Sequence, residues 1–157
     1  MAKFIEKFMK KAIELSIVNV TKGGGPFGAV IVKNGKIISE GTNNVTKKND
    51  PTAHAEIVAI RNASKKLKSY SLKGCEIYTS CEPCPMCLSA IYWSRLRRVY
   101  FGNTRKDAAR IGFDDDFLYR QVARPISKRT LPMKQFLRHE ARGAFVEWEE
   151  KPDKIAY

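Results

Sequence analysis

The stretch that decides the fold is TSCEPCPMCLSAIYW at 79–93, where a short apolar strand gives way to a helix. CEIYTS at 75–80 predicts the strand, and Pro85 suits the first position of the helix. Cys84 and Cys87 are separated by two residues at the start of that helix, so both thiols can point toward one ion. Three of the four cysteines lie in this stretch, which indicates a metal site or catalysis rather than disulfides.

Strands and helices alternate on both sides of this stretch. Asn34-Gly35 predicts a tight turn between two strands, which form an opening hairpin. The expected strands are GAVIV (28–32), KIISEG (36–41), CEIYTS (75–80), RVYFGN (98–103) and MKQFL (133–137). The expected helices cover 3–19, 52–68, 85–93 and 143–151, with two short helical pieces within 104–121. The pattern predicts a three-layer α/β/α domain with a mixed, roughly five-stranded central sheet.

Length and composition favour a single domain, 1–157, with enough apolar residues (43%) for one core. The longest apolar runs, such as FGAVIV at 27–32, are too short to span a bilayer. The N-terminal residues lack the apolar core of a signal peptide, so we expect a cytoplasmic protein. The formal charge of +13 suits a nucleic-acid partner and equally a solvated basic surface, and it assigns no function by itself.

His54 supplies a third metal ligand at the start of another expected helix. One nitrogen and two sulfur ligands favour Zn²⁺, and three protein ligands leave the fourth tetrahedral position for water. This arrangement is typical of catalytic zinc, with one ion per subunit. A closed structural site needs a fourth protein ligand, for which Cys81 is the nearby candidate.

Glu56 lies two residues after His54, where it can reach a zinc-bound water without binding the metal. A carboxylate there can take a proton from the water and return it to a leaving group. H-x-E alone is a weak signal, and P-C-x-x-C alone is shared with zinc ribbons and redox sites. Together, the two motifs resemble the signature of zinc-dependent deaminases.

The chain resembles the cytidine deaminase superfamily in HAE at 54–56 and TSCEPCPMC at 79–87. Further segments, and the terminal Tyr157, are similar to the bacterial guanine deaminase branch: GGPFGAVIVK (24–33), NNVT (43–46), NDPTAHAE (49–56), AIYW (90–93) and GFDDDFLY (112–119). This resemblance implies hydrolytic deamination of guanine to xanthine and ammonia. A zinc-activated water would attack C2, and Glu56 would carry protons to the ring nitrogen and the departing amine.

The same resemblance implies substrate contacts. Asn43 would hold the base, Asp115 would act at the exocyclic amine, Phe27 and Trp93 would wall the purine, and Tyr157 would close the pocket. Structural alternatives stay open for each of them. Asn43 can satisfy a turn, and any of three consecutive aspartates can cap the next helix. The two aromatic residues can be core, and a terminal tyrosine is disordered by default.

Three functions are compatible with the sequence. In the first, the resemblance implies a homodimer of guanine deaminases that exchange a C-terminal segment, about 130–157, so that Tyr157 serves the partner's site. In the second, a tRNA adenosine deaminase, the chain would use its basic residues against RNA: Arg95, Arg97, Arg98, Arg105, Arg110, Arg138 and Arg142. The third is a non-catalytic zinc module that binds nucleic acid, with Cys81 as the fourth ligand. We prefer the first, because a pocket sealed by Tyr157 excludes a polynucleotide.

Overall fold

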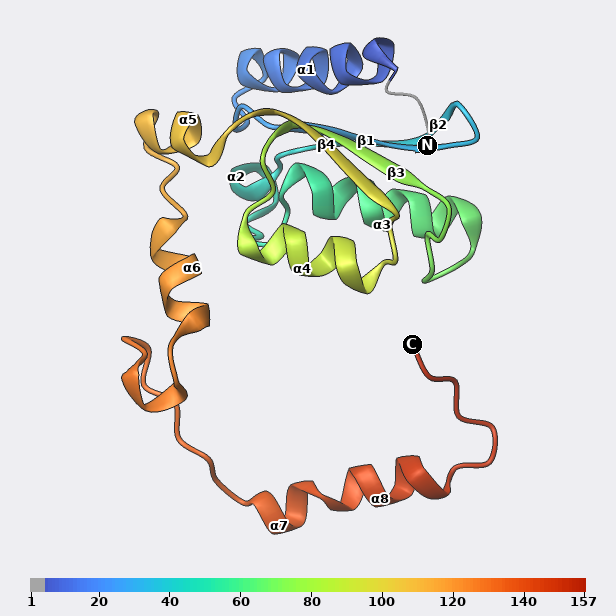
Figure 1. The fold of residues 1–157 in the computed structure, drawn as a ribbon, viewed down its shortest axis with the longest axis vertical. Coiled ribbons are helices and arrows are strands. Elements are labelled where there is room, and N and C mark those ends of the chain that lie inside the picture. The colour runs from blue at the N-terminus through green and yellow to red at the C-terminus, as the bar shows by residue number, and fades with distance from the viewer. Residues whose placement is uncertain (1–4) are drawn as a thin grey trace. The chain divides into compact units, whose positions relative to one another are not determined.

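A computed structural model describes residues 5–157 of the chain (Figure 1). The chain divides into two compact units, one ending at Leu118 and one covering Tyr119–Tyr157, and each is described by itself. The first two residues of the helix expected at 3–19 lie outside the described residues.

The first unit is built on a four-stranded sheet in the order β2-β1-β3-β4. The strands are β1 (Gly28–Lys33), β2 (Lys36–Thr42), β3 (Glu76–Cys81) and β4 (Arg98–Asn103). β1 pairs antiparallel with β2 and with β3, whereas β3 and β4 are parallel. The hairpin turns at Asn34 (φ 49°) and Gly35 (φ 71°), as the Asn-Gly pair predicts. The predicted mixed sheet is therefore confirmed.

The prediction of a fifth strand at 133–137 is wrong. These residues form no helix or strand, and their side chains are exposed. Five residues with some apolar positions do not by themselves identify a strand. A strand also needs a neighbouring strand that pairs with its backbone groups, and a short sequence pattern does not show one. The sheet accordingly has four strands among the described residues.

Helices cover both faces of the sheet, which confirms the three layers (Figure 1). α1 (Glu6–Thr21) packs on one face, where Val30, Val32 and Tyr78 meet its apolar side. α3 (Ala55–Leu67) and α4 (Pro85–Trp93) cover the other face, where Ala29 and Ile31 lie in the larger core cluster. β1 is thus buried on both faces, because its alternate side chains enter two different cores.

α3 approaches the sheet closely at a glycine. A Cβ atom on Gly41 would lie 2.1 Å from the carbonyl oxygen of Ala55, so no larger residue fits there without displacing the helix. Ala55 is the first residue of α3, so this contact fixes the helix at its N-terminus. The residues on either side of Ala55 are the predicted ligand His54 and the predicted proton carrier Glu56.

The remaining elements are short. They are α2 (Val45–Lys48), α5 (Arg105–Arg110), α6 (Asp116–Ala123), the 3₁₀ helix η1 (Ile126–Lys128), α7 (Arg138–Ala141) and α8 (Gly143–Glu150). α5 and α6 confirm the two helical pieces expected within 104–121, and Gly112 (φ 92°) lies between them. α8 confirms the closing helix.

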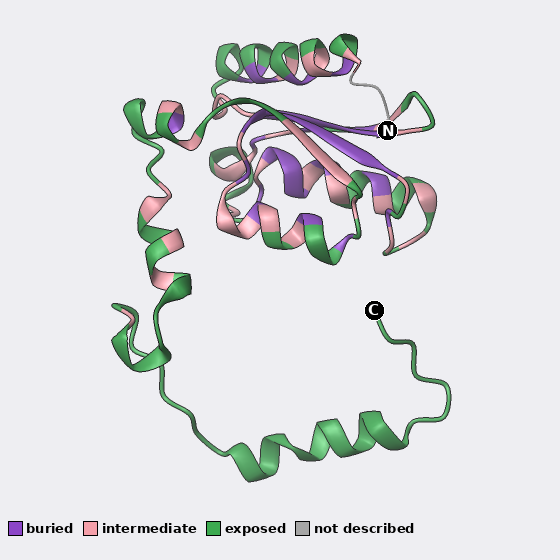
Figure 2. Cartoon of the chain, in the orientation of Figure 1, coloured by how far each residue is buried: buried purple, intermediate pink, exposed green. Residues whose placement is uncertain are grey.

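None of the residues 119–157, all of which the structure describes, is buried (Figure 2). Large apolar side chains lie open to solvent in this unit, among them Phe136 at 77% and Phe145 at 74% exposure. Within the described part of the chain, no helix has the length and apolar character needed to cross a membrane.

Candidate active site

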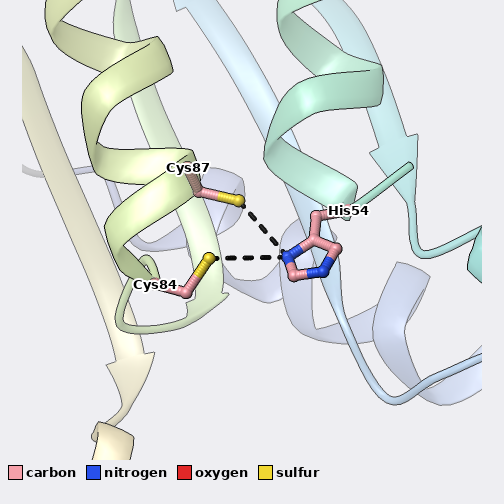
Figure 3. A group of neighbouring side chains, drawn as sticks. All are labelled: His54, Cys84 and Cys87. Carbon is pink, nitrogen blue, oxygen red and sulfur yellow. Dashed lines mark hydrogen bonds between the residues drawn. The ribbon is translucent and has the colours of Figure 1, made fainter. Parts of the chain in front are cut away.

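Two helix N-termini bring the predicted metal ligands together. His54 is the N-cap residue of α3, Cys84 is the N-cap residue of α4, and Cys87 lies in the first turn of α4. The His54 Nδ1 atom is 3.6 Å from the Cys84 sulfur and 3.5 Å from the Cys87 sulfur (Figure 3). The potential ligand atoms all lie within 4.8 Å of one another.

These distances fit a tetrahedral zinc ion. Zn–S bonds of about 2.3 Å and Zn–N bonds of about 2.0–2.1 Å place nitrogen and sulfur ligands about 3.6 Å apart at the tetrahedral angle. His54, Cys84 and Cys87 could therefore hold zinc without rearrangement. Cys81 is not part of this group, because its thiol lies 3.7 Å from the carbonyl oxygen of Thr104. The structure thus gives no support to Cys81 as a fourth ligand.

The two cysteines of the group differ in acidity. Hydrogen bonds from Cys87 and His54 lower the pKa of the Cys84 thiol to about 4, against the opposing effect of burial. The pKa of Cys87 is raised, because it donates to Cys84 and is buried. The pKa of His54 is raised as well, chiefly by its hydrogen bond with Cys84. A thiolate is thus available at neutral pH, and a bound cation would displace the remaining protons.

Glu56 lies in the first turn of α3 with 6% of its surface exposed. Burial raises the pKa of its carboxyl group to about 7. A group with a pKa near neutrality can both accept and donate a proton at physiological pH, which suits general acid–base catalysis. Glu56 lies outside the three-residue metal group, so its carboxylate is available for this role.

A cavity of about 430 Å³ opens in front of this group. Its lining contains six of the nine residues to which the sequence analysis assigned a preferred catalytic, binding or ligand role: Phe27, Asn43, His54, Glu56, Cys84 and Asp115. Cys87 is completely buried beside it. Every residue of the lining belongs to the first unit.

For Asn43 and Asp115, the contacts in the structure can be compared with the purely structural roles that the sequence left open. Asn43 is 7% exposed, and its Oδ1 accepts a hydrogen bond from the Val45 N–H at 3.3 Å, so it does satisfy a turn. Among the three aspartates, Asp114 accepts the Asp116 N–H at 3.0 Å. Asp114 and Asp115 both line the cavity, and burial raises the pKa of the Asp115 carboxyl group.

Two predicted substrate contacts are not among the residues that line this cavity. Trp93 ends α4 with 66% exposure, beside Tyr92 and Arg95 on the surface, and it is absent from the cavity lining. Tyr157 belongs to the second unit and is 71% exposed. Neither residue contributes to the cavity within the first unit, so both roles stay predictions.

The structure adds cavity residues that our sequence analysis did not assign to the site. The ring of Phe113 packs edge-on against Phe27, with ring centroids 4.9 Å apart and an interplanar angle of 88°. The Glu82 carboxylate accepts a hydrogen bond of 3.0 Å from the Arg105 backbone N–H, which connects the segment between β3 and α4 to the start of α5. The pairs Phe27–Phe113 and Glu82–Arg105 each join residues far apart in the sequence. Only the fold therefore shows that all four residues line one cavity.

Comparisons with known proteins agree with this geometry. The profile of the cytidine and deoxycytidylate deaminase zinc-binding region matches residues 2–103. The chain is 52% identical to the guanine deaminase of Bacillus subtilis (strain 168) over 153 residues, which are 97% of this chain and 98% of that protein. An X-ray structure of guanine deaminase from Bacillus subtilis superimposes with a TM-score of 0.95 at 51% identity, covering 99% of both chains. The tRNA-specific adenosine deaminase of Aquifex aeolicus is 46% identical over 96 residues, 61% of this chain and 64% of that protein.

Proposed function

The chain belongs to the cytidine and deoxycytidylate deaminase family, and from this premise we propose that it hydrolyses guanine to xanthine and ammonia. The observation that carries the proposal is the extent of the similarity. Likeness to the guanine deaminase covers 97% of the chain, whereas likeness to the Aquifex tRNA deaminase covers 61%. Asp115 and Tyr157, the proposed guanine contacts most particular to this branch, lie beyond residue 103, where the family match ends.

His54, Cys84 and Cys87 would hold one zinc ion, whose fourth ligand would be water. Zinc supplies Lewis acidity that lowers the pKa of this water to near neutrality. Glu56 would take one proton from the attacking water and give it to a ring nitrogen of guanine. It would then carry a second proton, from the hydroxyl group added to the base, to the departing amine, which leaves as ammonia. The pKa of about 7 suits both steps, because one carboxyl group must act as base and then as acid.

The other cavity residues would bind and orient the base. Asn43 would hydrogen-bond the purine, and Asp115 would act beside the exocyclic amine. Phe27, supported by Phe113, would form an apolar wall against the ring. These roles are supported by the presence of Phe27, Asn43 and Asp115 in one cavity with Glu56.

We also propose that two copies of the chain assemble. The unburied apolar side chains of residues 119–157 support this, because a soluble protein rarely exposes so many without a partner. An exchange of the segment about 130–157 would bring Tyr157 to the partner's cavity. Trp93 lies outside this segment, and its proposed role as a wall of the purine does not follow from the exchange.

We also propose a cytoplasmic location. None of the four cysteines forms a disulfide, which is the usual state of cysteines in a reducing compartment.

The test is ammonia release by the zinc-loaded protein from guanine, adenine, cytidine and unmodified tRNA side by side. Release from guanine alone is the expected result. Release only from tRNA would instead support the adenosine deaminase alternative, make the basic residues functional, and withdraw Asp115 and Tyr157 as guanine contacts. The Glu56→Gln variant, assayed in parallel, controls for contaminating deaminases.

A further inference from the structure

α1 covers the face of the sheet opposite α3 and α4 (Figure 1). Asn19 lies near the C-terminal end of this helix and is 3% exposed. Its side-chain amide donates two hydrogen bonds of 2.8 Å, one to the carbonyl oxygen of Gly25 and one to that of Asn43. Gly25 and Asn43 both line the cavity, whereas Asn19 does not. We propose that Asn19 is a positioning residue that holds Asn43 in place for binding the base, an inference that rests on the proposed function.

The contacts around Asn43 show how Asn19 could act through it. The Asn43 N–H donates to the carbonyl oxygen of Phe27 at 3.2 Å, and its own carbonyl oxygen accepts from Asn19. The backbone of Asn43 is therefore held on both sides. Since the allowed directions of a side chain follow from its backbone, Asn19 limits where the Asn43 amide can point.

The orientation of the Asn19 amide is fixed by its partners. Both carbonyl oxygens require the NH₂ group as donor, and the Oδ1 atom lies 3.4 Å from the Lys47 ammonium group. Every polar atom of this buried side chain thus has a partner. Loss of the amide would leave two carbonyl groups without their side-chain donor, in a place with little access for water.

The glycines of the loop leave room for this arrangement. A Cβ atom on Gly24 would lie 2.3 Å from the Asn19 Nδ2 atom. A Cβ atom on Gly25 would lie 3.1 Å from the Cγ atom of Asn43, tighter than an ordinary contact. The loop after α1 is therefore shaped around the side chains of Asn19 and Asn43.

A purely structural role for Asn19 is the competing explanation. Its carbonyl oxygen accepts from Lys22 and Gly24 as α1 ends, so the residue also belongs to a helix terminus. A structural role predicts lower stability without a specific change in substrate binding. A positioning role predicts a rise in KM that depends on the presence of the Asn43 side chain.

The experiment is a double-mutant cycle of Asn19→Ala and Asn43→Ala, with KM, kcat, zinc content and thermal stability measured for each protein. We expect Asn19→Ala to raise the KM for guanine roughly tenfold, as the loss of a buried hydrogen bond allows, with kcat and zinc content little changed. In the Asn43→Ala background, the same substitution should add almost nothing. An equal rise in both backgrounds, or no rise in either, overturns the proposal.

Ser39→Ala is the matched control. Ser39 is also buried, and its hydroxyl donates to the carbonyl oxygen of Ala59 at 2.7 Å, away from the cavity. This variant should lose a similar amount of stability and keep its KM. If Asn19→Ala does not fold, Asn19→Asp keeps the side-chain shape without the two donors and takes its place in the cycle.

A second experiment needs no substrate: NMR can measure the rate of hydrogen exchange at the backbone N–H of Asn43. We expect faster exchange in the Asn19→Ala variant than in Ser39→Ala, because the Asn43 backbone loses one of its two anchors. Unchanged protection overturns the proposal even if the wild-type protein proves inactive on guanine. Wild-type inactivity together with lost protection contradicts the proposed function alone.

Discussion

The two units of the chain differ in what they do with their apolar side chains. In the first unit, Ile31 and Tyr78 are completely buried between helices and sheet. In the second, Phe145 and Trp148 lie on a helix and remain 74% and 41% exposed. The first unit thus contains its own core and all the residues that line the cavity, whereas the second unit leaves large apolar side chains exposed, which is the basis for proposing a partner surface.

The largest expected effect tests whether the chemistry is confined to the first unit. Glu56→Gln should lower kcat by about 10³-fold, because the amide cannot carry a proton between water and the leaving amine. Zinc should stay bound, since the three ligands are untouched. Turnover and metal content measured on the same sample check this. Loss of zinc together with activity would show that Glu56 holds the metal instead.

The second prediction compares the two kinds of apolar residue directly. Ile31→Ala should reduce the free energy of unfolding by ~3 kcal/mol at any protein concentration, because it opens a cavity in the core. Phe145→Ala should change the unfolding of a single chain by less than ~0.5 kcal/mol and weaken the association of two copies about tenfold. Denaturant unfolding and analytical ultracentrifugation measure the two effects. A wild-type protein that stays monomeric at all concentrations would contradict the second half.

A third prediction concerns the pH dependence of stability in the metal-free protein. Burial raises the folded-state pKa of Glu56 from 4.5 to about 7. The folded protein therefore binds the proton more tightly than the unfolded chain, and the stability present below pH 4.5 is lost as the pH rises through 7. The loss should approach ~3 kcal/mol. Urea unfolding at pH 5 and pH 8 after chelation, compared with Glu56→Gln, measures it; parallel profiles for the two proteins would refute the assignment.

The smallest predicted effect asks whether the second unit takes part in catalysis. Deletion of residues 155–157 should lower kcat/KM for guanine roughly tenfold, because the pocket loses the tyrosine proposed to close it, while the melting temperature stays unchanged. Tyr157→Phe, which keeps the ring and removes the hydroxyl, separates closure from hydrogen bonding. Unchanged kinetics in the deletion variant would remove Tyr157 from the site.

Short-range patterns predicted the metal group and most of the fold. His54, Cys84 and Cys87 could be identified because each lies at or just inside a helix N-terminus with a local signal, such as Pro85 after Cys84. The strand expected at 133–137 could not be judged from sequence, because pairing depends on a distant neighbour. The role of Asn19 could not be predicted for the same reason, because its hydrogen bond to Asn43 joins residues 24 positions apart.

The cavity lining divides at the boundary of the family match. The residues from Gly25 to Cys84, which include the ligands and Glu56, come from the matched region, and those from Arg105 to Leu118 lie beyond it. Substitutions in the single segment from Arg105 to Leu118 would therefore alter one part of the cavity lining, including Asp115, and leave the three candidate metal ligands and Glu56 untouched. The base that the cavity accepts and the residues that hold the metal could thus be varied separately.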